Sequence, residues 1–160
     1  IKDGCKDILM LSDKNYYSTT RNRYKGYVDA HKKYSLPLNE GNVIKTDVSY
    51  ASSYDAIKKV IADGKKFDGI FCNNDMMALG ALQALKDSGI SVPEKCKIVG
   101  FDDITLSEKC DPPITTIQQD TDMFGKKSVE TLLNLIENNE IKNKNDIYVI
   151  PVKLVKRTTA

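Results

Sequence analysis

Several features that would identify common classes of protein are scarce or absent in this sequence. No apolar run approaches the ~20 residues that a transmembrane helix requires, so no segment is predicted to contact or span a membrane. Residues 1–11 have neither the long apolar stretch nor the small-residue cleavage site of a signal peptide. They begin without Met and enter an apolar run almost at once, from which we expect a fragment or a processed chain.

Histidine and cysteine, the usual ligands of zinc, are few and poorly placed for a metal site. The cysteines form no CxxC pair, whereas zinc ligands usually come in pairs ~2–4 residues apart. Cys72 and Cys96 lie in apolar runs and are expected to be buried thiols in a reducing compartment. The only histidine, His31, lies beside lysines and is expected on a helix surface, without a catalytic role. We therefore predict no metal site, no cofactor and no disulfide.

The common catalytic motifs and any strong excess of charge are also missing. The sequence has no GxSxG elbow, no P-loop and no HExxH helix, so catalysis is not favoured. Its 24 Lys and Arg are interspersed with 22 Asp and Glu, and a net charge of +2 gives no electrostatic footprint for nucleic acid. With 160 residues, 41% of them hydrophobic, the chain can form one compact domain or two small halves that share strands.

Short apolar runs alternate with amphipathic segments along the whole chain. Strands are predicted at 7–11, 43–47, 68–72, 97–101, 112–119 and 147–157, and helices at 18–34, 53–64, 75–89 and 123–138. Strand–helix alternation is typical of parallel βαβ units, and near-continuous apolar strands are typical of a sheet covered on both faces. The predicted fold class is therefore α/β, an open, mostly parallel, doubly wound sheet flanked by helices.

Carboxylate and amide residues follow the predicted strands. They occur at 12–13, 47, 73–75, 102–103 and 119–120. Ligands of open α/β sheets bind beyond the carboxyl ends of the strands, and such side chains suit a hydroxyl-rich small molecule such as a sugar. Asp and Asn are also favoured helix caps, which is the role we expect for Asp75. No clear helical period follows Asp102, so a ligand or hinge role is favoured there.

The adjacent Asp102 and Asp103 also permit an enzymatic interpretation. Two carboxylates after an apolar strand hold magnesium in phospho-receiver domains, which share this general plan. Those domains place the acidic cluster near the start of the chain and need a lysine at the end of a later strand. Here the pair follows the fourth strand and the next strand ends in Gln118, Gln119 and Asp120. Magnesium-dependent phosphoryl transfer therefore stays the less favoured alternative.

Three long segments resemble the effector-binding domain of lactose/galactose-repressor-type (LacI/GalR) transcription regulators. They are FDGIFCNNDMMALGALQALKDSGISVPEKCKIVGFDDI, PPITTIQQDTDMFGKKSVETLL and IPVKLVKRTTA. The first is shared more loosely with periplasmic sugar-binding proteins. The resemblance implies a cytoplasmic, non-enzymatic sensor of the periplasmic-binding-protein-like type I fold, with a small-molecule effector between two lobes. A periplasmic or surface-anchored receptor for sugars is the alternative, and a helix-turn-helix or a signal peptide upstream would discriminate the two.

The resemblance also implies a domain assignment. Residues 1–119 and 147–160 correspond to the C-terminal lobe, and 120–146 to a crossover helix segment of the otherwise missing first lobe. The DNA-binding domain is absent from this chain, so operator DNA would be bound only through that missing part. A homodimer is implied as the functional state.

Residue by residue, the resemblance implies four effector contacts. Arg23, in STTRNRYKGY, matches an arginine that clamps the effector, and Asn74 matches an amide that contacts it. Asp102 matches the carboxylate that takes effector hydroxyls, and Gln119 lies at a lobe crossover within reach of the effector. One departure concerns the aromatic ring that often follows the aspartate after the second strand, because Val48 stands there and only Tyr50 is near.

Two further expectations concern apolar side chains. The resemblance implies dimer contacts by Met76, Met77, Leu79 and Cys110, although the methionines alternatively fill the core. The helix at 123–138 carries an apolar stripe made of Phe124, Val129, Leu132, Leu133 and Ile136. Without a first lobe this stripe would face water, so we predict that the helix packs in a displaced position on its own lobe, or against another copy of the chain.

Overall fold

A four-stranded parallel sheet of order β2-β1-β3-β4 forms the centre of the molecule. The computed structural model describes residues 1–15, 17–138 and 148–160. The strands of the sheet are β1 (Ile8–Asp13), β2 (Val43–Thr46), β3 (Gly69–Cys72) and β4 (Lys97–Val99). Every pairing between them is parallel, and each successive strand is reached through a helical crossover. The predicted α/β fold class is confirmed.

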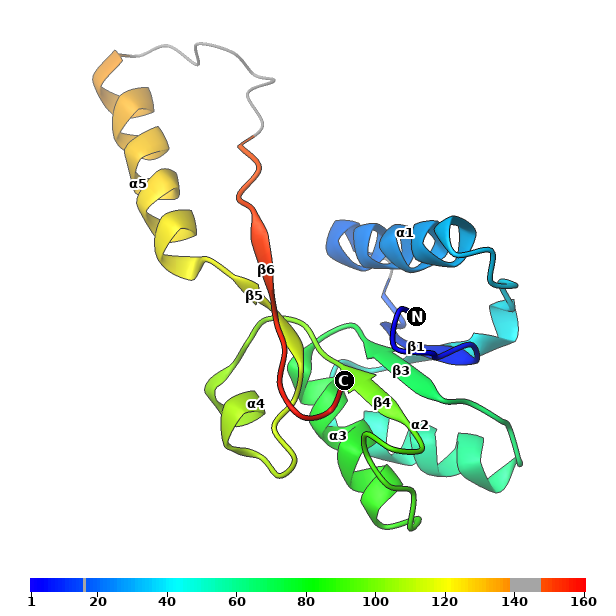
Figure 1. Ribbon diagram of the computed structural model, residues 1–160. Coiled ribbons are helices and arrows are strands. Elements are labelled where there is room, and N and C mark those ends of the chain that lie inside the picture. The colour runs from blue at the N-terminus through cyan, green and yellow to red at the C-terminus, as the bar shows by residue number, and fades with distance from the viewer. Residues whose placement is uncertain (16, 139–147) are drawn as a thin grey trace.

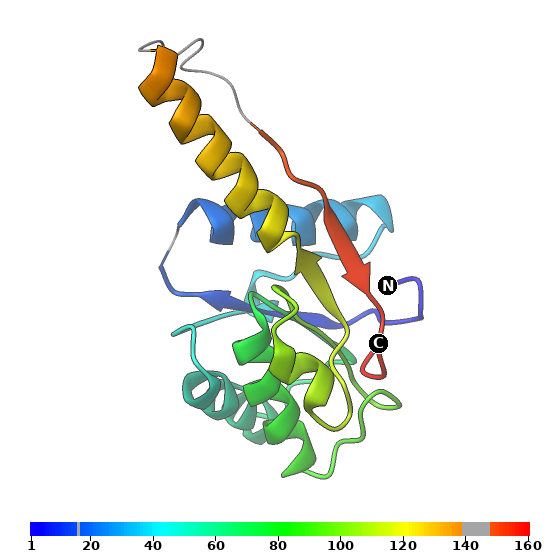
Figure 2. The ribbon, with the colours of Figure 1, turned by 90° about the vertical axis from the view of Figure 1, so that its left-hand side faces the viewer.

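Helices lie on both faces of this sheet. α2 (Tyr50–Ala62) and α3 (Asp75–Lys86) lie side by side on one face, and α1 (Ser18–Lys33) lies on the opposite face (Figures 1 and 2). Gly80 allows the close approach of α3 to α2, because a Cβ atom there would collide with the carbonyl oxygen of Tyr50. The core between the sheet and these two helices contains Leu9, Leu11, Ile57, Ile70, Met77, Leu85 and Ile98.

Local capping fixes where α2 and α3 begin. The Ser49 hydroxyl accepts the backbone N–H of Ser52, and the Asn74 carboxamide oxygen accepts that of Met77. Just beyond these helices, Gly64 and Gly89 have positive φ angles of 68°, the conformation that commonly follows a helix C-terminus. Asp75 was the expected cap of α3, and this prediction is wrong because Asn74 holds the capping position.

The chain beyond β4 forms a separate antiparallel ribbon of β5 (Thr116–Gln119) and β6 (Val152–Val155). Isolated parallel bridges join Val99 to Thr115 and Asp102 to Gln118, so the ribbon begins alongside β4. Both strands are shorter than predicted, and Pro113 and Pro151 lie before them, where a missing N–H limits strand pairing. Residue 147, in the predicted range, lies outside the described residues. A short helix, α4 (Thr105–Lys109), was not predicted.

Helix α5 (Thr121–Asn138) projects away from the sheet and its helices (Figures 1 and 2). Its N-terminus is capped by Asp120, whose carboxylate accepts the N–H of Met123. The apolar stripe faces solvent, with Phe124 65% and Ile136 66% exposed. The prediction that α5 packs on its own lobe is therefore wrong, because the β5–β6 ribbon leads the chain away from the core. Packing against another copy stays a prediction.

Two expectations about polar side chains have different outcomes. His31 is only 3% exposed, with its ring 4.2 Å from that of Tyr27 and Nδ1 2.9 Å from the Tyr27 carbonyl oxygen. The expected surface position is therefore wrong, since His31 lies one helical turn after Tyr27 on the face that α1 turns toward the sheet. Cys72 and Cys96 are buried free thiols as predicted, and burial raises the pKa of Cys96 to about 12.

Candidate functional site

Three of the four predicted effector contacts meet at one carboxylate. Asp102 follows β4, and its Oδ1 accepts hydrogen bonds from Gln119 Nε2 at 2.7 Å and from Arg23 Nη2 at 3.3 Å. Arg23 reaches this point from α1 and also donates through Nη1 to the carbonyl oxygen of Asn73, at 2.6 Å. A helix, the end of a parallel strand and the β5–β6 ribbon therefore meet at the carboxyl edge of the sheet.

The second oxygen of Asp102 is open. Within the described residues, every hydrogen bond to the Asp102 side chain ends on Oδ1, which leaves Oδ2 free to accept a proton donor. The carboxylate is half-buried, and burial, with a smaller contribution from the charge of Asp75, raises its pKa although Arg23 and Gln119 act to lower it. Burial likewise lowers the pKa of Arg23, although Asp102 opposes the shift. The site is a partly desolvated ion pair, in which a new hydrogen bond is stronger than in open water.

The backbone at the two aspartates adopts an unusual conformation. Asp102 has a φ angle of 111° and Asp103 one of 57°, and such angles cost a non-glycine residue about 1–3 kcal/mol. Several bonds hold the loop in place: Asp102 N–H donates to the Ile117 carbonyl, while Asp103 accepts Arg157 Nη2 at 2.7 Å and Gln118 Nε2 at 2.9 Å. Backbone strain that tertiary bonds maintain is typical of functional sites.

An aromatic ring that sequence reasoning missed also belongs to this site. The guanidinium carbon of Arg23 lies 3.9 Å from the ring centroid of Phe101, a cation–π contact that orients the arginine toward Asp102. The signal was present in the sequence, since Phe101 directly precedes the aspartate pair. Val48 and Tyr50, considered for the missing aromatic wall, keep exposed side chains after β2.

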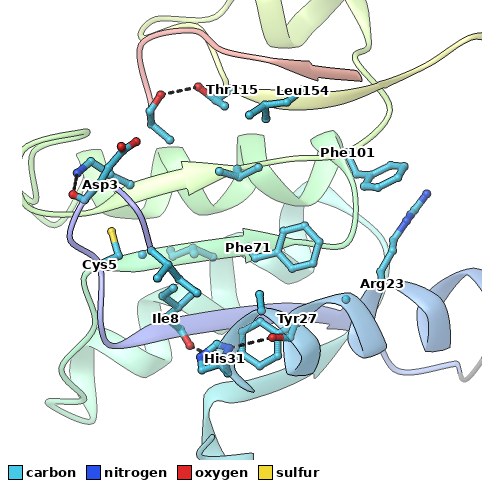
Figure 3. Close-up of a pocket in the computed structure, with 18 of the residues that line it drawn as sticks. Asp3, Cys5, Ile8, Arg23, Tyr27, His31, Phe71, Phe101, Thr115 and Leu154 are labelled. Carbon is cyan, nitrogen blue, oxygen red and sulfur yellow. Dashed lines mark hydrogen bonds between the residues drawn. The ribbon is translucent and has the colours of Figure 1, made fainter. Parts of the chain in front are cut away.

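A cavity of about 640 Å³ extends from this cluster along the sheet face beneath α1. Arg23 and Phe101 lie together at one end and Asp3 and Cys5 at the other (Figure 3). The walls between these ends are largely apolar, and the contributing side chains include Ile8, Tyr27, Phe71, Val99 and Leu154. Ligand sites combine apolar walls with a few placed polar groups, and here charged groups lie at both ends, with Arg23 at one and Asp3 at the other.

The fourth predicted contact, Asn74, does not share hydrogen bonds with this cluster among the described residues. Its carboxamide oxygen caps α3, and within the described residues no hydrogen bond connects it with Arg23, Asp102 or Gln119. In the part of the chain that the structure describes, its NH₂ group has no hydrogen-bond partner. An effector contact by Asn74 therefore stays a prediction.

The expected dimer contacts differ in how accessible they are. Met77 is fully buried in the core, so the structure contradicts a contact between this side chain and a partner. Met76, on the outer side of α3, is 37% exposed, whereas Leu79 and Cys110 are partly buried against the core. Helical geometry explains the difference, because neighbouring positions on a helix point in different directions.

Both carboxylates of the proposed magnesium site are already paired with arginines. Asp102 is paired with Arg23, and Asp103 is paired with Arg157 through side chains that are 10% and 16% exposed. A divalent cation at this pair would have to compete with the two positively charged guanidinium groups. In the ranges 1–15, 17–138 and 148–160, no group of three or more His, Cys, Asp or Glu side chains is arranged to hold a metal ion.

The chain is similar to transcriptional repressors over its whole length. Residues 1–160 match the family described as the periplasmic binding protein-like domain. The chain is 30% identical to the HTH-type transcriptional repressor PurR of Pasteurella multocida over 158 residues, which are 99% of this chain and 47% of that repressor. It is 31% identical to PurR of Aliivibrio fischeri over 161 residues, with the same coverage of 99% and 47%.

Solved structures with this fold include two regulators with bound small molecules. The complex of the transcriptional regulator CelR with cellobiose has a TM-score of 0.91 and 26% identity, covering 99% of this chain and 48% of that one. The Lac repressor bound to ONPG in the repressed state has a TM-score of 0.89 and 29% identity, covering 99% and 47%.

The chain spans about half the length of the curated relatives it matches. Those relatives are repressors rather than enzymes. Among the helices of the described residues, none has the length and apolar character needed to cross a membrane. The match of the whole chain, together with the shared architecture, gives its family: the chain belongs to the periplasmic-binding-protein-like domain family, in the form found in LacI-type transcription regulators.

Proposed function

We propose that this chain is the effector-sensing lobe of a transcriptional repressor, and that its effector is a hydroxyl-rich small molecule such as a sugar. The observation that carries the proposal is the convergence of Arg23 and Gln119 on Oδ1 of Asp102, with Oδ2 left open. In this arrangement the positive charge of Arg23 compensates the negative charge of the aspartate, the amide of Gln119 fixes its orientation, and Oδ2 is an acceptor of fixed direction.

Each group of the cluster has a distinct task in this proposal. Oδ2 of Asp102 accepts a hydroxyl of the effector, and the remaining N–H groups of Arg23 donate to a neighbouring oxygen. The ring of Phe101 packs against the guanidinium group of Arg23, which restricts its orientation, and contributes apolar surface beside it. Cellobiose in the CelR complex is a sugar, which supports this class of effector here.

Effector binding would act on DNA through a change in lobe arrangement. Residues 120–146 would belong to the other lobe, and the β5–β6 ribbon would connect the two lobes. An effector that prefers one arrangement shifts the equilibrium toward it, and the same coupling changes the affinity for operator DNA. DNA binding would use a segment outside this chain. Homodimer contacts would involve the exposed Met76, together with the partly buried Leu79 and Cys110.

The direct test is a thermal-shift panel on the full-length protein, with cellobiose, ONPG, other mono- and disaccharides and nucleobases as probes. A probe that stabilises the protein is then titrated by calorimetry into wild type, Asp102→Ala and Asp55→Ala. Asp55 is an exposed carboxylate on α2 and serves as the matched control. Loss of one bond to a charged group should cost Asp102→Ala about 1.5–3 kcal/mol of binding free energy, and the control nothing. Unchanged affinity in Asp102→Ala would remove Asp102 from the site, and a panel with no sugar binder would reject this effector class.

A further inference from the structure

Asp75 is a fully buried carboxylate at the first position of α3, and no contact described above for the effector uses it. Its Oδ1 accepts the hydroxyl of Thr116 at 2.6 Å, and its Oδ2 accepts the backbone N–H of Ile104 at 3.0 Å. Its own backbone N–H donates to the carbonyl oxygen of Phe101 at 2.9 Å. A buried carboxylate is tolerated only when such partners replace water, which is what Thr116 and Ile104 do for the two oxygens of Asp75.

These bonds hold the loop that carries Asp102 from both sides. Phe101 directly precedes Asp102, and Ile104 follows two residues later. Gly100 lies so close to Asp75 that a Cβ atom there would collide with Oδ1. The loop from 100 to 104 therefore passes closely around the Asp75 side chain. The positive φ angles of Asp102 and Asp103 lie between these two attachment points.

The remaining bond extends the same attachment to the ribbon. Thr116 is the first residue of β5, and Gln119, which donates to Asp102, is the last. Because β5 has only four residues, a bond that holds Thr116 in place also limits where the side chain of Gln119 can lie. Asp75 therefore connects both partners of the Gln119–Asp102 hydrogen bond with the N-terminus of α3.

We infer that Asp75 is the positioning residue of the effector site, which sets where Asp102 and Gln119 stand relative to each other. It acts through the loop and the ribbon and does not contact the effector. The inference rests on the proposed function for the identity of the site. The placement of Asp102 by Asp75, however, is measurable without any effector.

Thr116 offers a matched pair of variants for the test. Thr116→Val keeps the shape of this buried side chain and removes the hydroxyl donor, whereas Thr116→Ser keeps the donor. In the 160-residue chain, the side-chain carboxyl ¹³C signal of Asp102 is assigned by its loss in Asp102→Asn. Thr116→Val should move this signal, and Thr116→Ser should leave it at the wild-type position. An unmoved signal in folded Thr116→Val would overturn the inference.

A second measurement needs no variant and decides the matter if Thr116→Val does not fold. Amide hydrogen exchange in the wild-type chain should protect Ile104 as strongly as Ile70 in the central sheet. Exchange at Ile104 as fast as in exposed loops would show that Asp75 does not hold the loop, and would overturn the inference.

Binding then connects this placement with the effector. In the full-length protein, with cellobiose or whichever probe of the panel binds wild type, Thr116→Val should bind about tenfold more weakly and Thr116→Ser should bind normally. In the Asp102→Asn background Thr116→Val should cause no further loss, because its effect passes through Asp102. An equal loss in both backgrounds would overturn the positioning role. A wild type that binds no probe contradicts the proposed function, while the carboxyl signal still decides the role of Asp75.

Discussion

Replacing Arg157 with methionine should destabilise the chain far more than replacing its neighbour Lys156. Arg157 Nη2 bonds to Asp103 Oδ1 at 2.7 Å, and Nη1 donates to the carbonyl oxygen of Ile114 at 3.0 Å. The two charged side chains are only 16% and 10% exposed, so water does not replace a lost partner. Lys156, in contrast, pairs with Asp3 through side chains that are 63% and 49% exposed.

The expected magnitude follows from what each substitution leaves behind. Removing one partner of a buried ion pair usually costs about 3–5 kcal/mol, because the other charge stays buried without compensation. Gln118 still donates to Oδ2 of Asp103, so we expect a cost somewhat below this range, about 2–3 kcal/mol. For a chain of this size that corresponds to a fall in Tm of roughly 5–10 °C. The exposed Lys156 pair should contribute far less, because solvent screens it.

Urea unfolding followed by circular dichroism measures both variants, and the double variant Asp103→Asn/Arg157→Met completes the cycle. The double variant should lose clearly less stability than the sum of the losses in the two single variants. Each single substitution leaves one buried charge without its partner, whereas the double variant leaves none. If Arg157→Met and Lys156→Met lost equal stability, or if the cycle were additive, the ion pair would not hold the loop and this reasoning would be refuted.

Three further predictions use other parts of the structure. Gly80→Ala should cost about 1–3 kcal/mol of stability through collision with the backbone of α2, whereas Gly26→Ala, which meets nothing within 4 Å, should gain about 0.5–1 kcal/mol in urea unfolding. Burial raises the pKa of Asp102 above its ordinary 3.8, so effector affinity measured by calorimetry should fall as the pH drops through that raised pKa, and Asp102→Asn should remove this dependence. The contribution of Asp102 to folding stability should instead rise as the pH drops over the same range, because the folded state disfavours the ionised form. If another copy covers α5, Leu132→Glu should reduce self-association in sedimentation, whereas Lys127→Glu, on the opposite side of the helix, should not. A wild type that stays monomeric at high concentration would contradict this packing.

The regular elements could be predicted because their signals are local. Strands covered on both faces appear as apolar runs, and the rule that ligands bind at strand carboxyl ends selected Asp102 and Gln119 without coordinates. The role of Asp75 could not be predicted in the same way. Asn and Asp have similar capping preferences, so local propensity does not determine whether Asn74 or Asp75 is the cap. Tertiary contacts decide it, since the buried bonds to Ile104 and Thr116 fix Asp75 one position inside the helix.

The same limit applies to the burial of side chains on α1 and α5. His31 lies among lysines, which favoured a surface position, but its distance from Tyr27 is one helical turn and the ring contacts that neighbour. The apolar stripe of α5 was recognised from its period, yet periodicity shows only that a face needs a partner. It does not show where the partner lies. In the described part of the chain that face stays exposed, from Phe124 to Ile136.

Two adjacent carboxylates after a buried strand have divided roles in this structure. Asp103 turns inward to Arg157 and Gln118 and holds the strained loop against the ribbon. Asp102 turns toward Arg23, and in the part of the chain that the structure describes no hydrogen bond reaches its Oδ2. Because the bonds of Asp103 to Arg157 and Gln118 already hold the loop, the strained backbone at Asp102 is maintained before any effector arrives. Effector binding therefore does not have to order this loop. In the proposed sensor, an effector that pulls on Asp102 would therefore act directly on Asp103, and through Arg157 on the ribbon that leads to α5.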